Sequence, residues 1–412
     1  MATALLLMVA CVEEQILVTS ISMDTSILVL TTGETSILTT IVEPYDASNK
    51  SIIWKSEDPS IAVVNSKGEV TAIAPGMTTI TGTTEDGLFK VKCTVMVDVN
   101  PTIVMTTANA RDVRIFLAGR GELCIDWGDG TNYDVESALS QFNTYYKEYT
   151  HAYTSSSTHT IKITSKEILR LQYVGYQIID FDVSHATALS SLQLWGNELT
   201  SLDLNNNTQL NSLICYDNKL TSLDLSKATM LADLHCENNK LTNLDLNTTE
   251  LVTLSCNNNE LTNLDVRNNA KLTQITCNNN RITSLDLSTN IFLADLFCQN
   301  NQITSIEAGK RVVRFDCSFN QLKTLDVRID SLIQNLYCNN NQLTSLEVAD
   351  NAPLKYLDCS SNQLTTEALN ALFEMLNDRS NLGDKYINII NNPGTDDCDQ
   401  TIAEKKGWRI IF

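Results

Sequence analysis

The sequence predicts a mainly β protein, with two β-sandwich domains followed by a solenoid of about 21-residue turns and an α/β cap. One phrase, L-x-C-x-x-N-x-L-T-x-L-D-L, recurs between about residues 192 and 362. Its cysteines lie 19 to 21 residues apart, and a fixed period of this size indicates a solenoid. Before the repeats, short runs of alternating apolar and polar residues are broken by glycine and proline, which is typical of β-sandwich strands.

Residues 1–18 are expected to form an export leader and a linker. A short apolar run ends at Cys11 and is too short to span a bilayer as a helix. Residues 8–11 (Met-Val-Ala-Cys) resemble the lipobox of bacterial lipoproteins, and residues 12–14 (Val-Glu-Glu) resemble the acidic signal that sends such proteins to the cell surface. The resemblance implies lipid attachment at Cys11 and anchoring to the outer membrane of a bacterium. The alternative is an unstructured N-terminus.

Residues 19–99 are expected to form the first sandwich. The stretch from Trp54 to Val64 (WKSEDPSIAVV), followed by GEVTA from Gly68 and a further glycine at Gly76, resembles the bacterial immunoglobulin-like domain of group 2. The resemblance implies a spacer or adhesive module. Trp54 is expected in its core rather than on a sugar-binding surface.

Residues 100–166 are expected to form the second sandwich, after a linker at Asn100-Pro101. The stretches CIDWGDGT from Cys124, YTHAY from Tyr149 and HTIKI from His159 resemble the PKD-type sandwich of bacterial surface proteins. Asp129-Gly130 suits a tight hairpin, because glycine accepts positive φ and aspartate bonds to the following backbone.

Four residues of this second sandwich are candidates for acid–base chemistry or metal binding: Asp126, Asp129, His151 and His159. Each carboxylate has a ready role in a turn or cap, so we expect no catalytic residue and no metal ligand here. A calcium ion held near the turn is the alternative.

Residues 167–365 are expected to form the solenoid, with residues 168–188 as a degenerate N-terminal cap. In each turn a leucine and the cysteine two residues later point the same way and stack on the next turn. The expected core row is Leu192, Leu213, Leu234, Leu254, Ile275, Leu296, Phe315, Leu336 and Leu357. An asparagine three residues after each cysteine is expected to bond the backbone of adjoining turns.

Eight cysteines occupy the same repeated position: Cys215, Cys236, Cys256, Cys277, Cys298, Cys317, Cys338 and Cys359. Stacked strands lie about 4.8 Å apart with parallel side chains, whereas a disulfide needs Cβ atoms about 3.8 Å apart that face each other. Four convergent metal ligands are equally incompatible with a linear row. We therefore expect free, buried thiols. The pattern resembles the cysteine-ladder leucine-rich repeats of internalin-like bacterial surface proteins, which implies protein recognition and no particular reaction.

Residues 366–412 are expected to form the α/β cap. Apolar residues at helical spacing follow Thr366, which is the expected N-cap. Strand, helix and strand patterns then occupy residues 386–390, 396–406 and 408–411. This cap would close the open edge of the solenoid.

The composition opposes several functions. The chain has 49 acidic residues and 29 lysines and arginines. The resulting net charge of −20 disfavours binding to nucleic acid and to anionic membrane surfaces. We find no nucleophile motif with its histidine, no phosphate loop and no two-histidine metal signature, so we expect neither an enzyme nor a cofactor. The sequence predicts a cell-surface adhesion or protein-recognition protein that binds a macromolecule. The alternative is a glycan-binding or glycan-processing component that uses the sandwich loops.

The expected binding surface is the concave strand face, at the outward positions beside each inward leucine and cysteine. Its candidate ligand-binding residues are Phe297, Arg314, Tyr337, Trp195, Tyr216, His235 and Tyr356. We prefer the first three because they lie on turns far from either end. Packing of Trp195 on the N-terminal cap and of Tyr356 on the C-terminal helix is the alternative. The acidic residues of the L-D-L phrase are expected to form a solvated outward column, held by hydroxyls such as that of Ser201. The alternative is a column bridged by divalent cations.

Overall fold

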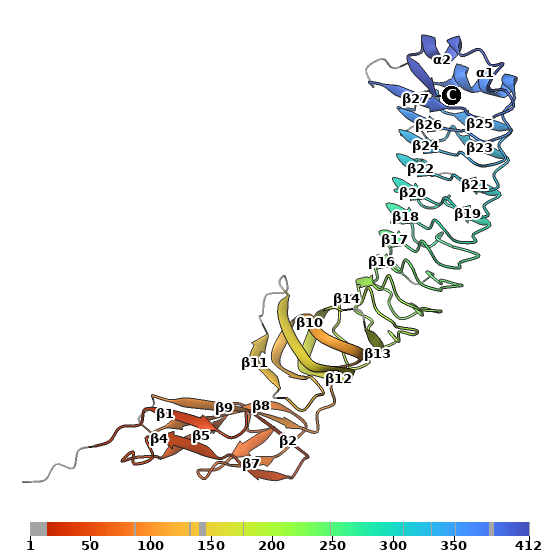
Figure 1. The fold of residues 1–412 in the computed structure, drawn as a ribbon. Coiled ribbons are helices and arrows are strands. Elements are labelled where there is room, and N and C mark those ends of the chain that lie inside the picture. The colour runs from red at the N-terminus through yellow and green to blue at the C-terminus, as the bar shows by residue number, and fades with distance from the viewer. Residues whose placement is uncertain are drawn as a thin grey trace, which may run out of the picture.

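The computed structural model describes residues 15–85, 88–131, 133–139, 146–175, 177–247, 249–307, 309–330, 332–350, 352–378 and 383–411. Cys11 and the other residues of 1–14, within the expected leader and linker, lie outside the described residues. The molecule is elongated and bent, with a small β domain at one end and a curved solenoid at the other (Figure 1). No helix in the described ranges is long and apolar enough to cross a membrane.

The first domain contains nine short strands in two main sheets. They are β1 (Ser20–Met23), β2 (Ile27–Leu30), β3 (Thr35–Ile37), β4 (Thr40–Glu43), β5 (Ile52–Ser56), β6 (Ala62–Val64), β7 (Glu69–Ala72), β8 (Gly76–Thr84) and β9 (Lys90–Val97). One sheet has the order β2-β9-β8-β5, the other β3-β7-β6, and β1 pairs with β4. Trp54 packs against the core between them, over Gly68 and Gly82, where an added Cβ would lie about 3 Å from its ring. Trp54 is therefore a core-packing residue, as expected.

The middle segment contains two long, bent strands, β10 (Ile103–Asp126) and β12 (Lys147–Val174), with the shorter β11 (Asp134–Leu139) and β13 (Ile178–Asp182). β10 pairs antiparallel with β12, and the register shifts at several points. The end of β12 then pairs in parallel with the first solenoid strand, so the sheet runs without a break into the solenoid. The expected domain boundary after residue 166 falls inside β12. Most buried apolar residues of this segment belong to the same core as those of the solenoid, while Cys124 packs with Ile27 and Met96 of the first domain.

The solenoid has one short strand per turn on its concave face. These strands are β14 (Ser191–Gln193), β15 (Ser212–Ile214), β16 (Asp233–His235), β17 (Thr253–Ser255), β18 (Gln274–Thr276), β20 (Asp295–Phe297), β22 (Arg314–Asp316), β24 (Asn335–Tyr337) and β26 (Tyr356–Asp358). All of them pair in parallel, with the core residues of the predicted row directly opposite one another. On another side of the stack, β19 (Ser284–Asp286) pairs with β21 (Ser305–Glu307), and β23 (Thr324–Val327) with β25 (Ser345–Val348). The predicted turns of about 21 residues are confirmed.

The core of the solenoid is the predicted row of apolar side chains, all fully buried. Each contributes about 1.5–3 kcal/mol through burial. The eight ladder cysteines are also fully buried and free, and the thiols of Cys236 and Cys338 donate to backbone carbonyls of the next turn at 3.5 and 3.4 Å.

The asparagine column binds the turns together. The Nδ2 of Asn280 donates to the carbonyls of Cys256 and Cys277 at 3.1 and 3.0 Å, and its Oδ1 accepts from the amide of Leu261 at 3.0 Å. Equivalent bonds recur along the column, for example at Asn218. The predicted structural role of these asparagines is confirmed.

The L-D-L aspartates point outward, but they are not held as expected. The Oδ1 of Asp203 accepts a hydrogen bond from the backbone amide of Asn205 at 2.9 Å, and that of Asp224 does so from Ser226. Each aspartate thus caps the tight turn that follows it. The expected role of the Ser201 hydroxyl was therefore wrong, since the bond to Asp203 comes from the amide that follows it. Hydroxyls after the aspartate, those of Ser226 and Ser288, do bond Asp224 and Asp286.

The C-terminal cap consists of α1 (Thr366–Met375), β27 (Lys385–Asn388), α2 (Thr401–Lys405) and β28 (Trp408–Ile411). The N-cap of α1 is Thr365 rather than the expected Thr366, since the Thr365 hydroxyl accepts from the amide of Ala368. β27 and β28 add two parallel strands to the concave sheet, in register with β26. The concave face is therefore two strands longer than the repeats alone predict.

Candidate binding site

The concave sheet carries the candidate binding residues. Because its parallel strands pair in register, the outward side chains form columns along the stack, about 4.8 Å from one turn to the next. Side chains on successive turns therefore contact one another. The strands that carry them lie on the inner side of the bend (Figure 1).

Phe297, Arg314 and Asp295 form one compact cluster on β20 and β22. The Nε and Nη2 atoms of Arg314 donate to the two carboxylate oxygens of Asp295, both at 2.6 Å. The Arg314 guanidinium also lies over the Phe297 ring, 5.9 Å from its centroid, within cation–π range. The Arg314 side chain is 55% exposed, so it remains available to a partner.

Tyr337 and Tyr356 contact each other on β24 and β26, with ring centroids 5.0 Å apart. Both residues are partly buried, and burial together with the nearby Asp358 raises the pKa of Tyr356. The structure thus brings together the preferred residues of the sequence prediction and Tyr356 as neighbours at one end of the face. The ring contact observed for Tyr356 is with Tyr337, and the alternative of packing on the C-terminal helix stays untested.

Two further residues extend this cluster, and the sequence analysis missed both. Tyr386 of β27 pairs in register with Tyr356, and Arg409 of β28 pairs with Tyr386. The Arg409 guanidinium lies 5.7 Å from the Tyr386 ring centroid and forms an ion pair with Asp384 at 3.0 Å. The signal was present, because residues 386–388 and 409–410 repeat the outward–inward alternation of the turns before them. We call Phe297, Arg314, Tyr337, Tyr356, Tyr386 and Arg409 the C-terminal aromatic patch.

The other predicted residues lie near the N-terminal end of the same face. The rings of Trp195 and Tyr216 stack, with centroids 5.8 Å apart and planes 12° from parallel. His235 lies between two carboxylates, 3.2 Å from Asp233 and 3.2 Å from Glu237. The hydrogen bond to Glu237 is the main cause of its raised pKa, while burial acts in the opposite direction.

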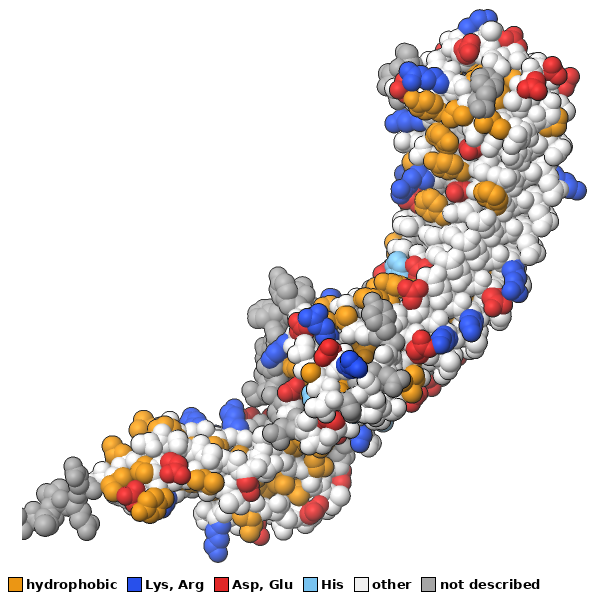
Figure 2. Space-filling view, viewed as in Figure 1, with side chains coloured by type: hydrophobic (Ala, Val, Ile, Leu, Met, Phe, Trp, Pro, Cys, Tyr) orange, Lys and Arg blue, Asp and Glu red, His pale blue; other side chains and the backbone are white. Residues whose placement is uncertain are grey.

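The two ends are separated by a stretch of small and polar side chains on β17 and β18. Its outward residues are Thr253, Ser255, Gln274 and Thr276. Figure 2 shows the contrast: hydrophobic and charged side chains gather along the upper inner edge of the solenoid, whereas its middle is largely uncharged and polar. The predicted distribution of large side chains toward both ends is therefore present in the structure.

Two of the candidate acid–base or metal-binding residues of the middle segment, Asp129 and His151, bond to each other. His151 Nε2 lies 2.8 Å from Asp129 Oδ2, and its ring stacks on Trp127 at 4.9 Å. Tyr153 stacks on His159 at 3.7 Å and donates its hydroxyl to the Trp127 carbonyl. Asp126 instead accepts from the amide of Gly128, as a turn residue does.

The Asp129 carboxyl of this cluster has a lowered pKa. Burial opposes its ionisation, but hydrogen bonds from Thr131 and His151 outweigh burial and lower its pKa to about 2. An anionic carboxylate held by this many donors is a structural feature rather than a proton donor at neutral pH. Within the described ranges, no group of three histidine, cysteine or acidic side chains converges as metal ligands do.

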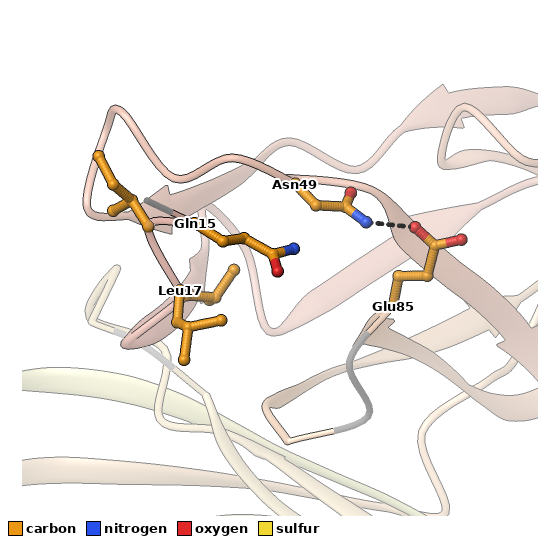
Figure 3. A pocket seen from close by; sticks show the side chains of 6 residues that line it. Gln15, Leu17, Asn49 and Glu85 are labelled. Carbon is orange, nitrogen blue, oxygen red and sulfur yellow. Dashed lines mark hydrogen bonds between the residues drawn. The ribbon is translucent and has the colours of Figure 1, made fainter. Parts of the chain in front are cut away.

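A small hollow lies at the free end of the first domain. It measures about 200 Å³ and is lined by Gln15, Ile16, Leu17, Val18, Asn49 and Glu85. Asn49 and Glu85 are joined by a hydrogen bond at one side of it (Figure 3). Its volume is below the roughly 300–1,000 Å³ of ordinary ligand pockets, so we do not assign it a ligand.

Residues 17–95 match the family model of the bacterial Ig-like domain (group 2). This match confirms the resemblance that the sequence indicated for the segment. The chain has an N-terminal Ig-like domain followed by a β-solenoid with turns of about 21 residues. The PKD-type resemblance of residues 100–166 stays a prediction.

Curated relatives align over short segments. An uncharacterised protein of Clostridium acetobutylicum is 41% identical over 76 residues, which are 18% of this chain and 19% of that protein. An alpha-L-arabinofuranosidase of Bifidobacterium longum is 41% identical over 71 residues, which are 17% of this chain and 7% of that protein. The chain therefore spans less than a fifth of the length of these relatives.

Among solved structures, the chain is similar to the functional domain of InlJ from Listeria monocytogenes, which includes a cysteine ladder. The identity is 28% and the TM-score 0.47, with 52% of this chain and 48% of that chain covered. A leucine-rich repeat protein of Leptospira interrogans shows 17% identity and a TM-score of 0.33, with 56% and 80% covered.

Proposed function

We propose that this chain is a recognition protein whose solenoid binds a macromolecular partner on its concave face, with the C-terminal aromatic patch as the contact site. The supporting observation is the gathering of aromatic rings and guanidinium groups at one end of a face whose middle is small and polar. Aromatic residues and arginine are the usual anchors of interfaces, each costing about 2 kcal/mol or more when truncated. The patch therefore has the composition of a binding hot spot.

The proposed partner is a protein, and the proposed location is the surface of a bacterium. The Ig-like domain would then hold the solenoid away from the cell, with Cys11 as a lipid attachment site. Incorporation of a labelled fatty acid into the wild-type chain, and its absence from Cys11→Ser, would support the anchor. Equal labelling of both would contradict it.

The proposed role is binding rather than catalysis. The strongest catalytic candidates, Asp129 and His151, bond to each other, and Trp127 covers the histidine ring. A glycan ligand is the competing possibility and is included in the experiment below.

The experiment selects ligands on the folded protein and then tests the face. A phage library of random peptides and a glycan array are screened with the wild-type chain. Selected ligands are then measured against Phe297→Ala/Arg314→Ala/Tyr337→Ala and against a control, Thr253→Ala/Gln274→Ala, in the small and polar part of the same face. We expect at least tenfold weaker binding by the triple variant and unchanged binding by the control. Equal affinity for all three proteins would overturn the proposal.

A further inference from the structure

We propose that the C-terminal aromatic patch takes a lysine or arginine side chain of a polypeptide partner, against Asp316 and between the rings of Phe297 and Tyr337. This inference rests on the proposed function and adds the chemistry of the ligand. It follows from the order of side chains in one column of the concave sheet.

The column alternates aromatic rings and carboxylates. Phe297 pairs in register with Asp316, Asp316 with Tyr337, and Tyr337 with Asp358. With neighbouring strands about 4.8 Å apart, Phe297 and Tyr337 lie about 10 Å apart with Asp316 midway. A cation interacts with an aromatic ring up to about 6 Å from its centroid, so one cation at Asp316 lies within reach of both rings.

Neither carboxylate of this column, Asp316 or Asp358, forms an ion pair within the described ranges. Asp316 Oδ1 accepts from the amide and hydroxyl of Ser318 at 3.0 and 2.6 Å. Arg314 is the nearest cation on the same strand, but its guanidinium already donates two hydrogen bonds to the Asp295 carboxylate. The carboxylates of Asp295, Asp316 and Asp358 and the guanidinium of Arg314 together carry a formal charge of −2. This charge favours a cationic ligand.

Phe319, at the edge of the same turn, is a second and independent observation. It has a φ of 53°, in the left-handed region that bulky residues avoid. The equivalent residues of the other repeats are glycine, aspartate, asparagine or serine, and several are linked by side-chain hydrogen bonds, as Asn258 is to Asn238 at 2.6 Å. Phe319 replaces such a polar residue with a ring that is 51% exposed.

An exposed aromatic residue kept in a strained conformation suggests a role other than folding. Phe319 follows Asp316 by three residues in the same turn and adds an exposed apolar side chain to that turn. Exposed aromatic side chains next to the Asp316 carboxylate fit a peptide segment in which a basic side chain is flanked by apolar ones. A free amine or a neutral glycan would use only part of this surface.

The test uses the peptides selected on the full chain. Each is made with its basic residue and with norleucine or another neutral isostere in its place, and measured on wild type, Asp316→Asn, Phe319→Asn and Asp286→Asn. Asp286 is the matched control, because its Oδ1 accepts from the amide of Ser288 in the same kind of turn as Asp316 but on another side of the stack. We expect Asp316→Asn to weaken the basic peptides at least tenfold and Asp286→Asn to leave them unchanged. Phe319→Asn should weaken them severalfold.

The neutral peptides separate this inference from the proposed function. We expect them to bind wild type at least tenfold more weakly than the basic ones, and to lose nothing further on Asp316→Asn. If selected ligands lack basic residues, or are glycans, and still lose binding in the triple variant, the cation site is overturned and the proposed face stands. If ligands bind the triple variant normally, the proposed function itself fails. A screen that enriches no peptide on the wild-type chain also overturns the inference.

Discussion

Arg314 and Asp295, 19 residues apart in sequence, form a bidentate ion pair across neighbouring turns, with both N–O distances at 2.6 Å. The pair fixes the guanidinium beside Phe297 while leaving its side chain largely in solvent. An arginine ordered in advance loses less side-chain entropy on binding.

Asp295→Ala should therefore weaken ligand binding severalfold although it removes no expected ligand contact. Because the Arg314 side chain of the pair is exposed to solvent, the ion pair contributes little to stability. The free energy of unfolding should therefore change by less than about 1 kcal/mol. Calorimetric titration of a selected ligand measures the first effect and urea unfolding the second. If Asp295 acts only through Arg314, the double variant with Arg314→Ala should bind no more weakly than Arg314→Ala alone.

Asp330 should make the solenoid less stable as pH rises. It is fully buried, one carboxylate oxygen has no hydrogen-bond partner in the described part of the chain, and burial raises its pKa to about 6 although the Leu332 amide acts against the shift. Its unfolded pKa is near 3.9. The raised pKa in the fold means that stability is fully present below about pH 4 and is lost as pH rises through about 6.

Asp330→Asn should remove this loss and stabilise the protein at pH 7 by on the order of 1–3 kcal/mol. At the equivalent place in an earlier turn, Asn290 donates its amide to the carbonyls of Val266 and Asn269. Urea unfolding of both proteins at pH 4.5 and pH 7 measures the difference. A variant less stable than wild type at pH 7 would show that the carboxylate itself is needed.

Phe319→Asn should raise the free energy of unfolding, by about 1 kcal/mol, because asparagine adopts the left-handed conformation at lower cost. Phe292→Asn is the control, since Phe292 is equally exposed, at 52%, but is not among the residues with positive φ. That control should stay within about 0.5 kcal/mol of wild type. Destabilisation by Phe319→Asn would mean that the ring packs productively where it stands.

Asn280→Ala should destabilise the solenoid by about 2–4 kcal/mol. The substitution leaves the carbonyls of Cys256 and Cys277 and the amide of Leu261 without their buried partner. Asn278→Ala, on the concave face two residues earlier, should have little effect. Chemical unfolding of the two variants measures the difference. Equal free energies of unfolding for the two would contradict a structural role for the Asn280 side chain.

The ladder thiols should be unreactive in the native protein. Burial raises the pKa of Cys215 and of Cys277 to about 12, so almost no thiolate is present at pH 8. Alkylation followed by mass spectrometry should leave these cysteines unmodified in the native protein and modify them after unfolding. Rapid native alkylation at the ladder would contradict the observed burial.

The repeats were predictable because each turn obeys a local rule. An inward leucine and cysteine with an asparagine three residues later fix the strand, its register and its bend, so the columns of Phe297 and Tyr337 can be read from the alternation alone. The Ig-like domain was predictable for a different reason, since its motif from Trp54 to Val64 is distinctive.

What the sequence did not predict depends on contacts between unlike segments. The Arg314–Asp295 pair needs the register of two turns that differ in length, and Tyr386 and Arg409 lie where the 21-residue period has ended. The continuous sheet from β12 into β14 arises from two long strands whose pairing has no short motif. Phe319 was missed although its repeat position is small or polar in the other turns, because the sequence alone does not show that this position has a positive φ.

The central claim is that a partner covers the C-terminal aromatic patch, and hydroxyl-radical footprinting tests it most directly because aromatic side chains report their own exposure. The wild-type protein is oxidised with and without a saturating selected ligand, and oxidation is quantified by mass spectrometry. Bound ligand should protect Phe297, Tyr337 and Tyr356 severalfold and leave Phe292, on the flank of the stack, unchanged. Oxidation of Phe297, Tyr337 and Tyr356 to the same extent with and without bound ligand would contradict the account.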